Sequence, residues 1–277
     1  MWGAVCGDVI GSYYEVHCTK EYDFPLVRES TFTDDSVLIA AVCRAILEDP
    51  RPVGRFSLGE RARQYAAQYR RFYSFFPHAG FGNMFADWAK NGGGKTVRSY
   101  GNGGAMRVIP IGYAYDTLEQ TLLQAKASCL STHRHREAVK GAQAVAACVY
   151  LARHKASREE IRDYVRKHFY PLKESLGELR ESHVFDSRAS YSVPPAIQAF
   201  LESHDYESAV RNAVSLGGDA DTQACIAGGI AEAFYGEVPP HILRFCTSRV
   251  DLTIRKTLEE FRETFLQNTV LFSFMPF

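Results

Sequence analysis

The sequence lacks an excess of charge of either sign, because Lys plus Arg and Asp plus Glu each total 32. Proteins that bind nucleic acid through electrostatics carry a basic field, so we expect no nucleic-acid partner. No apolar run reaches the length of a membrane span, and the first residues do not form a charged region followed by an apolar core. We therefore expect no membrane association and a cytoplasmic location.

Paired cysteines are also missing. The seven cysteines are an odd number, and none forms a C-x-x-C pair. Most lie in apolar runs of helical spacing, where a free thiol behaves as a small hydrophobic group. Disulfide frameworks belong to oxidising compartments, so reduced core thiols fit a cytoplasmic protein.

Alternation of apolar and polar residues with a period of two is nearly absent, whereas apolar spacing typical of helices recurs about ten times. No repeat of fixed length and no Pro/Ser-rich linker divides the chain. We predict one all-α domain over residues 1–277. The expected helices cover residues 3–14, 33–49, 58–73, 81–90, 117–130, 136–153, 157–170, 193–202, 205–216, 220–235 and 252–267.

Several helix ends carry recognisable signals. Thr117 with Gln120, and Ser157 with Glu160, have the spacing of capping boxes. The two prolines at 194 and 195 fit the first turn of a helix. The apolar tail, residues 269–277, is predicted to dock on the body of the protein or on a second subunit.

Two acidic segments stand at the start of apolar helices: Thr33-Asp34-Asp35, and Asp219-Ala220-Asp221-Thr222 after two glycines. Either segment alone is also explained as a helix cap with acidic residues in the first turn. Both helices are apolar nearly all round, however, so four carboxylates would begin in a buried place, which is costly without a cation. The pair therefore predicts a dinuclear site for Mg²⁺ or Mn²⁺, which prefer oxygen ligands.

Other metal sites fit poorly. In an EF-hand read from Asp219, a glycine would stand at Ala224 and a glutamate at Ile230. Zinc is not expected, because the chain has no His/Cys ligand spacing.

Three further features have two interpretations each. Glu15, at the end of a helix of small residues, is either a solvated acid or a general base or gate beside a metal-bound water. Residues 99–104 combine glycines with hydroxyls, as a phosphate or ribose site requires, but glycine-rich loops are common. His133, just before a helix, is either a capping or surface residue or a ligand contact.

The segments GDVIGSYYE, FTDDS, SYGNGGAMRV, STH, SVPPAIQAFL and SLGGDADT occur in this order between residue 3 and about residue 236. Together they resemble the ADP-ribosylglycohydrolase family. That family includes dinitrogenase reductase-activating glycohydrolase and the ADP-ribosylarginine and ADP-ribosylserine hydrolases. The resemblance implies a compact orthogonal bundle of helices with two Mg²⁺ or Mn²⁺ ions beside bound ADP-ribose.

The resemblance also implies roles for individual residues, matched motif by motif. The metal ligands would be Thr33, Asp34, Asp35, Asp219, Asp221 and Thr222. The catalytic carboxylate would be Glu15, with the metal-binding Asp34 and Asp35 as competitors. The substrate would be bound by Ser99, Tyr100, Gly101, Asn102, Gly103 and His133.

The sequence departs from the family pattern in a few places. Ser36 stands where threonine is usual after the two aspartates, and Ala220 where threonine or serine often lies between the aspartates. Neither residue is expected to bind metal, and the apolar tail has no counterpart. The aromatic residue that stacks on adenine is unassigned, with Phe76, Phe81 and Tyr100 as candidates.

The implied activity is hydrolysis of the bond between C1″ of ADP-ribose and an acceptor, either a protein or a small molecule. GDVIGSYYE and SYGNGGAMRV are closest to the branch that acts on O-linked ADP-ribose, including serine adducts, O-acetyl-ADP-ribose and poly(ADP-ribose). An arginine-linked specificity is the alternative. A non-catalytic ADP-ribose-binding module and a structural protein are further hypotheses, which the complete set of ligand residues disfavours. We expect a monomer or a weak homo-oligomer.

Overall fold

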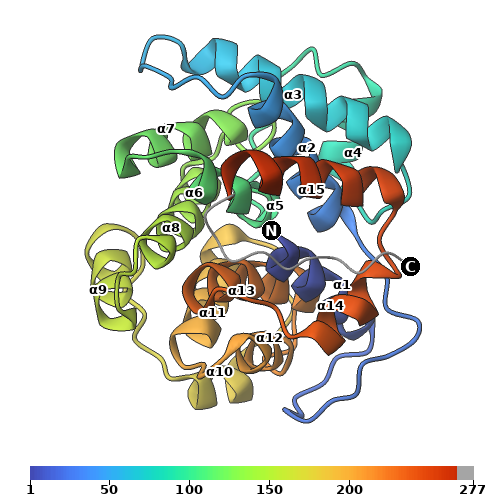
Figure 1. Ribbon diagram of the computed structural model, residues 1–277, viewed down its shortest axis with the longest axis vertical. Helices are drawn as coiled ribbons and strands as arrows, with labels where there is room; N and C mark the ends of the chain where they lie inside the picture. Colours follow the sequence, from blue (N-terminus) through green and yellow to red (C-terminus); the bar gives the residue numbers. More distant parts are fainter. Residues whose placement is uncertain (267–277) are drawn as a thin grey trace.

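Helices make up the architecture of the computed structural model, which describes residues 1–266 (Figure 1). Within these residues β-structure is limited to the isolated bridges Arg98↔His133 and Gly101↔Arg188, so the all-α prediction is confirmed. The helices are α1 (Trp2–Val16), α2 (Asp34–Glu48), α3 (Leu58–Phe75), α4 (Asn83–Lys90), α5 (Gly103–Met106), α6 (Ile109–Ala114), α7 (Leu118–Cys129), α8 (Arg136–Arg153), α9 (Arg158–His168), α10 (Leu176–Ser182), α11 (Ala189–Leu201), α12 (Tyr206–Val214), α13 (Ala220–Tyr235), α14 (Pro240–Thr247) and α15 (Leu252–Phe265).

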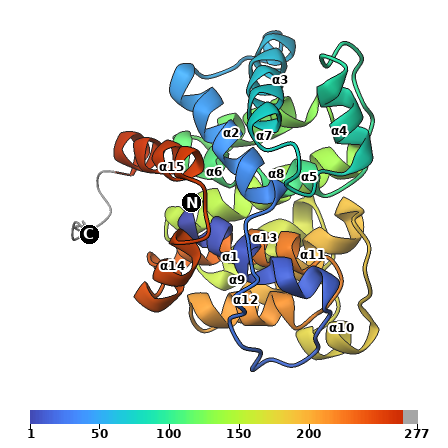
Figure 2. The same cartoon turned by 90° about the vertical axis from the view of Figure 1, so that its right-hand side faces the viewer.

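The helix pair α1 and α13 lies at the centre of the molecule in both views (Figures 1 and 2). Their backbones touch because small residues face each other. A Cβ atom added to Gly7 would lie 2.0 Å from the carbonyl oxygen of Ala224, and one added to Gly11 would lie 2.5 Å from that of Ala220. The close approach runs antiparallel, so the C-terminal end of α1 meets the N-terminus of α13.

The other helices pack around this pair in two groups. Figure 2 shows α2, α3, α4 and α7 above it, α10 and α12 below it, and α11 beside it. Helix α8 contacts α5, α6, α7, α11 and α13 and thereby joins the two groups, while α15 packs on α2. Helix α2 contacts α1 and α13, which brings its N-terminus to the start of α13.

Helix α11 begins at Ala189, four residues before the predicted start, so Pro194 and Pro195 lie inside the helix rather than in its first turn. Proline in a helix removes a backbone hydrogen bond and clashes with the preceding turn. The first turn of α11 is held from outside instead, because Ala189 N donates to Tyr100 O and Asn102 Nδ2 donates to Ser192 Oγ. The prediction was wrong because these anchors come from a distant loop.

The cap of α7 differs from the predicted capping box. Thr117 accepts the expected hydrogen bond from Gln120 N, but the Gln120 side chain does not return to the cap. Its amide bonds both backbone groups of Val53, with the Val53 N to Oε1 distance at 2.8 Å and the Nε2 to Val53 O distance at 3.0 Å. Gln120 therefore fixes the α2–α3 loop, whereas Ser157 and Glu160 form the full capping box expected for α9.

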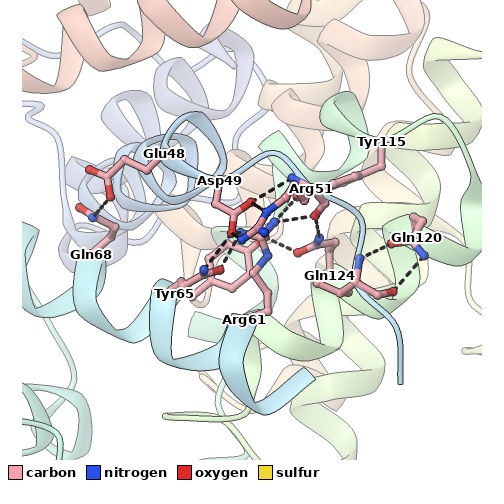
Figure 3. Close-up of polar contacts among 11 residues, drawn as sticks. Glu48, Asp49, Arg51, Arg61, Tyr65, Gln68, Tyr115, Gln120 and Gln124 are labelled. Atoms are coloured by element: carbon pink, nitrogen blue, oxygen red, sulfur yellow. Dashed lines mark hydrogen bonds and ion pairs between the residues drawn. The ribbon is translucent and has the colours of Figure 1, made fainter. Parts of the chain in front are cut away.

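The α2–α3 loop is also fastened from below by Arg61 and Gln124 (Figure 3). The buried Arg61 guanidinium donates to Arg51 O at 2.8 Å, and Tyr65 donates its hydroxyl to Gln124 Oε1 at 2.9 Å. The neighbouring carboxylate of Asp49 accepts from the Arg51 guanidinium, which holds the Asp49 pKa below its usual range. A buried polar group without such partners is destabilising, so this network keeps the connection in one conformation.

Other predictions meet the structure with small differences. The short helices α5, α6, α10 and α14 were not predicted, and α15 ends at Phe265 rather than at residue 267. Six cysteines are buried as free thiols and only Cys18 is exposed. Among the described residues, no helix combines the length and the apolarity that crossing a membrane requires. The apolar tail 269–277 lies outside the described residues, and a single domain over 1–277 stays a prediction.

Candidate functional site

The turn before α13 places two carboxylates and a hydroxyl at the helix N-terminus. Gly217 and Gly218 have φ angles of +69° and +74°, a region that residues with a side chain rarely adopt. The turn makes Asp219 the N-cap of α13 and puts Asp221 and Thr222 in its first turn, all three buried.

The N-terminus of α2 meets this turn. Thr33 caps α2 by accepting from Asp35 N, and Thr222 Oγ1 donates to Asp35 Oδ2 at 3.3 Å across 187 residues of sequence. Asp35 is buried and Asp34 is partly buried. The structure therefore brings the two predicted acidic segments together.

Two groups of carboxylates have the spacing that a cation requires. One contains Asp8, Asp35 and Asp221, the other Glu15, Asp219 and Asp221, and within each group the ligand oxygens lie within 4.8 Å of one another. Asp35 Oδ1 is buried and has no hydrogen-bond partner among residues 1–266. A buried acceptor without a partner is costly, and an all-oxygen donor set suits a hard divalent cation, so these residues fit a metal.

Asp8 was not predicted as a site residue. Its Oδ2 atom accepts hydrogen bonds from Thr33 N at 3.0 Å, from Ser36 N at 3.1 Å and from Ser36 Oγ, and its Oδ1 atom accepts from Thr33 Oγ1 at 2.7 Å. These four bonds engage both carboxylate oxygens, three at Oδ2 and one at Oδ1, so Asp8 positions the N-terminus of α2 and keeps a lone pair on Oδ1 for a cation. A signal for Asp8 was present in the sequence, because Asp8 is the aspartate of GDVIGSYYE, one of the segments that carry the family resemblance.

Burial and mutual repulsion raise the pKa of most of these carboxyl groups. Burial raises the pKa of Asp34 to about 8, with the charges of Asp8, Asp219 and Glu15 as further causes. The pKa of Asp35 is raised well above its usual range by burial and then by Asp8, Asp34 and Asp219. The pKa of Asp221 is also raised well above its usual range, by burial and then by the charges of Asp219, Asp35 and Glu15. A cation among them would remove this cost.

Glu15 lies one residue before the end of α1 and is partly exposed. Burial and the charges of Asp219 and Asp8 raise its pKa. It thus combines contact with solvent and closeness to the carboxylate group of α13, which is where a base that activates water must lie.

The glycine-rich segment connects directly to the acidic cluster. Asn102 Nδ2 donates to Asp219 Oδ2 at 2.8 Å and to Ser192 Oγ at 2.9 Å, so the buried Asn102 amide links the loop to α13 and α11. Ser99 Oγ accepts from Gly101 N at 3.1 Å and closes a tight turn. The structure therefore brings residues 99–103 beside the carboxylates.

His133 is buried against this segment, not capping or on the surface. A Cβ atom added to Gly103 would lie 3.0 Å from His133 Nε2, and one added to Gly101 would lie 3.8 Å from the same atom. The residue that caps α8 is instead His135, whose Nδ1 accepts from Glu137 N. Burial, and then the Arg107 charge, lower the pKa of His133 well below its usual range, which favours the neutral ring.

The three candidate aromatic residues differ in what they offer to a ligand. Phe81 stacks on Phe85 with ring centroids 5.1 Å apart, and Phe76 packs edge-on against Phe32 at 5.6 Å. Tyr100 is 54 % exposed, and its ring meets that of His135 edge-on, with centroids 6.0 Å apart. Tyr100 therefore has the largest free ring surface of the three.

Comparison with known proteins identifies the family to which the chain belongs. A family model described as ADP-ribosylglycohydrolase matches residues 1–270. The chain belongs to the ADP-ribosylglycohydrolase family. It is similar to ADP-ribosylhydrolase ARH3 of Homo sapiens, with 26% identity over 88% of this chain and 87% of the relative, and to ARH3 of Xenopus tropicalis, with 26% identity over 86% of each.

Two further comparisons give an arginine hydrolase and a solved structure. ADP-ribosylarginine hydrolase Tri1 of Pseudomonas putida is 28% identical over 56% of this chain and 44% of the relative. A solved structure titled ADP-ribosylglycohydrolase-related protein complex matches with a TM-score of 0.67 at 23% identity, covering 94% of this chain and 95% of that chain, which shows the shared fold. As a member of this family, the chain is a glycosyl hydrolase.

Proposed function

We propose that the protein hydrolyses the bond between C1″ of ADP-ribose and an oxygen of its acceptor. The observation that carries this proposal is that the two groups of three carboxylates described above share Asp221. One of their oxygens, Asp35 Oδ1, is buried without a partner among the described residues. Asn102 connects that cluster to a glycine-rich turn, whose lack of side chains lets a phosphate or ribose approach the backbone closely.

Two Mg²⁺ or Mn²⁺ ions would be held by Thr33, Asp34, Asp35, Asp219, Asp221 and Thr222. When bound, such ions orient sugar hydroxyls and lower the pKa of a coordinated water. The hydroxyl protons of Thr33 and Thr222 are donated to Asp8 Oδ1 and Asp35 Oδ2, which leaves oxygen lone pairs for a cation.

Glu15 is the proposed general base. Water attacks C1″ through a transition state with oxocarbenium character, and Glu15 takes a proton from the attacking water. The acceptor oxygen leaves with the electron pair of the broken bond and is protonated by solvent water to give the free hydroxyl. Bound cations would offset the repulsion from Asp219 and Asp8 that raises the Glu15 pKa, so that the carboxylate is ionised near neutral pH. A metal-binding aspartate, Asp34 or Asp35, is the competitor for this role.

The substrate is proposed to lie along residues 99–103. Ser99, Gly101, Gly103 and Asn102 would contact the diphosphate and the distal ribose, with His133 on the same side. Adenine would stack on Tyr100, because its ring is the most exposed of the candidates.

The O-linked specificity is supported by GDVIGSYYE and SYGNGGAMRV, which are closest to the serine-type branch. The length of the matches agrees, since similarity to the ARH3 proteins spans 78–88% of the chain and similarity to the arginine hydrolase spans 56%. Arginine-linked ADP-ribose is the second candidate, because that relative shares the family.

A release assay tests the proposal. Purified protein is supplied with Mg²⁺ or Mn²⁺ and given serine-linked peptide, arginine-linked peptide, O-acetyl-ADP-ribose and poly(ADP-ribose) in parallel. We expect release from O-linked substrates and its loss after exhaustive chelation. Turnover of the arginine-linked peptide alone would reverse the linkage, and full activity in chelator would contradict the metal-dependent scheme. Tight ADP-ribose binding without turnover of any linkage would favour the binding-module hypothesis.

A further inference from the structure

A chain of hydrogen bonds behind the glycine-rich turn begins at Arg107. Its guanidinium is fully buried, and Nη2 donates to Ser128 O at 2.8 Å and to Thr132 Oγ1 at 2.9 Å. The guanidinium carbon lies 4.2 Å from the ring centroid of Tyr69, a cation–π contact. No carboxylate of the described residues forms an ion pair with Arg107. Its positive charge is therefore stabilised by neutral groups, the acceptors Ser128 O and Thr132 Oγ1 and the ring of Tyr69.

The second link is the buried hydroxyl of Thr132, which lies 2.9 Å from His133 Nδ1. A guanidinium only donates, so the Arg107 contact occupies Thr132 Oγ1 as an acceptor. The Thr132 hydroxyl proton has one acceptor among its hydrogen-bond partners in the described residues, which is His133 Nδ1. The direction of the chain is therefore Arg107 to Thr132 to His133.

The direction decides which ring nitrogen carries the proton. If Nδ1 accepts, the neutral imidazole carries its proton on Nε2. The alternative tautomer would direct two donors at Thr132 Oγ1 and leave the Thr132 proton without an acceptor. A doubly protonated ring would place a second cation beside the buried guanidinium.

The Nε2 edge of the ring faces the turn of residues 101–103. His133 is buried, with only 6 % of the residue exposed, and yet its Nε2 atom forms no hydrogen bond with any described residue. A donor held at such a position matches an oxygen that can only accept, such as a phosphoryl oxygen.

We propose that Arg107 and Thr132 are positioning residues that hold His133 as the Nε2–H tautomer, so that the ring donates to an oxygen of ADP-ribose bound at the 101–103 turn. The ligand in this proposal rests on the proposed function, whereas the tautomer does not. With the opposite tautomer, Nε2 would present a lone pair to the same oxygen and repel it. The chain thus links a buried cation to the recognition of a substrate oxygen.

The wild-type tautomer is measured first, because it requires no variant that alters the chain. In protein labelled with ¹⁵N at histidine, long-range ¹H–¹⁵N correlations distinguish Nδ1–H, Nε2–H and the doubly protonated ring. The His133 signals are assigned by their absence from His133→Gln. We expect the Nε2–H form from pH 6.5 to 8, and an Nδ1–H or doubly protonated ring would overturn the proposal.

Thr132→Val removes the hydroxyl at nearly constant volume, and Thr132→Ser is the matched control that restores it. We expect Thr132→Val to lose the single tautomer and to weaken binding of ADP-ribose by roughly 10-fold in calorimetry, since one hydrogen bond to a charged group is lost. In a release assay KM should rise with kcat nearly unchanged, because the contact is remote from C1″. Thr132→Ser should restore both, and unchanged tautomer and affinity in Thr132→Val would contradict the proposal.

A second pair of variants covers the case in which Thr132→Val does not fold. Glutamine places an amide donor near the position of Nε2, whereas asparagine places it near Nδ1. His133→Gln should keep ADP-ribose affinity within about 3-fold of wild type, and His133→Asn should lose roughly 10-fold. Equal affinities for the two would overturn the proposal. If no substrate is hydrolysed but these differences in ADP-ribose binding hold, the proposed activity fails and the positioning chain stands.

Discussion

At the scale of single residues, the site depends on carboxylates whose roles differ by what surrounds them. Both Asp8 oxygens are engaged by hydrogen bonds from the start of α2, while Asp35 Oδ1 is buried without a partner. Glu15 is partly exposed. The same chemical group therefore serves as an anchor, a ligand candidate and a base candidate.

Replacing Glu15 by Gln tests the base. The amide cannot take a proton from water, so we expect kcat to fall by about 10²–10⁴-fold, the range for general base catalysis. Metal and ADP-ribose binding, followed by calorimetry, should change much less. A kcat within 3-fold of wild type would transfer the role to a metal-binding aspartate.

Asp34→Ala tests the metal cluster. We expect metal affinity to fall by more than about 10-fold, the lower limit seen for residues that only support a ligand, with release activity lost. The fold should persist, because removing one carboxylate relieves the repulsion that raises the neighbouring pKa values. Unchanged turnover at saturating metal would remove Asp34 from the site.

At the scale of elements, the backbone contact between α1 and α13 brings Glu15 and Asp8 to the start of α13. The contact requires glycine where a carbonyl of α13 touches α1, as at Gly7. It also explains why a helix of small residues precedes Glu15.

Gly7→Ala therefore tests the close packing of α1 against α13. The added Cβ atom would lie 2.0 Å from a backbone oxygen, so we expect the free energy of unfolding to fall by about 3 kcal/mol or more. Gly59→Ala is the matched control, since the added Cβ atom would meet only the end of the Arg63 side chain at 3.9 Å. It should be neutral or stabilising by up to about 1 kcal/mol in urea unfolding. Equal effects of the two variants would contradict the packing argument.

At the scale of the whole molecule, stability is coupled to pH and to cation binding. Asp34 has a pKa of about 8 in the fold and about 4 in an unfolded chain, so the folded protein binds more protons between these values. This contribution to stability is present below about pH 4 and is lost as the pH rises through about 8. Repulsion in the metal-free cluster is therefore greatest in alkaline solution.

In chelator, Tm should fall by several degrees between pH 6 and pH 8.5, and Mg²⁺ or Mn²⁺ should raise Tm more at pH 8.5 than at pH 6. Differential scanning fluorimetry measures both effects. Asp34→Asn should flatten the pH dependence. A chelated wild-type Tm that is constant or rises over this interval would contradict the coupling.

The sequence by itself determined the helical class, most helix positions and the two acidic segments, because apolar spacing and capping residues act locally. Helix α13, for example, occupies the predicted residues. The sequence motifs also indicated the family before any contact was known.

Only the tertiary structure decided what depends on distant contacts. It showed that Asp8 anchors α2, that Gln120 bonds Val53 rather than its own helix cap, and that His133 is buried behind the turn. It also moved the start of α11 to Ala189, since a distant loop holds the turn before the prolines. The physical reason is the same in each case: a polar side chain chooses among partners that folding brings near, and sequence spacing shows only the local ones.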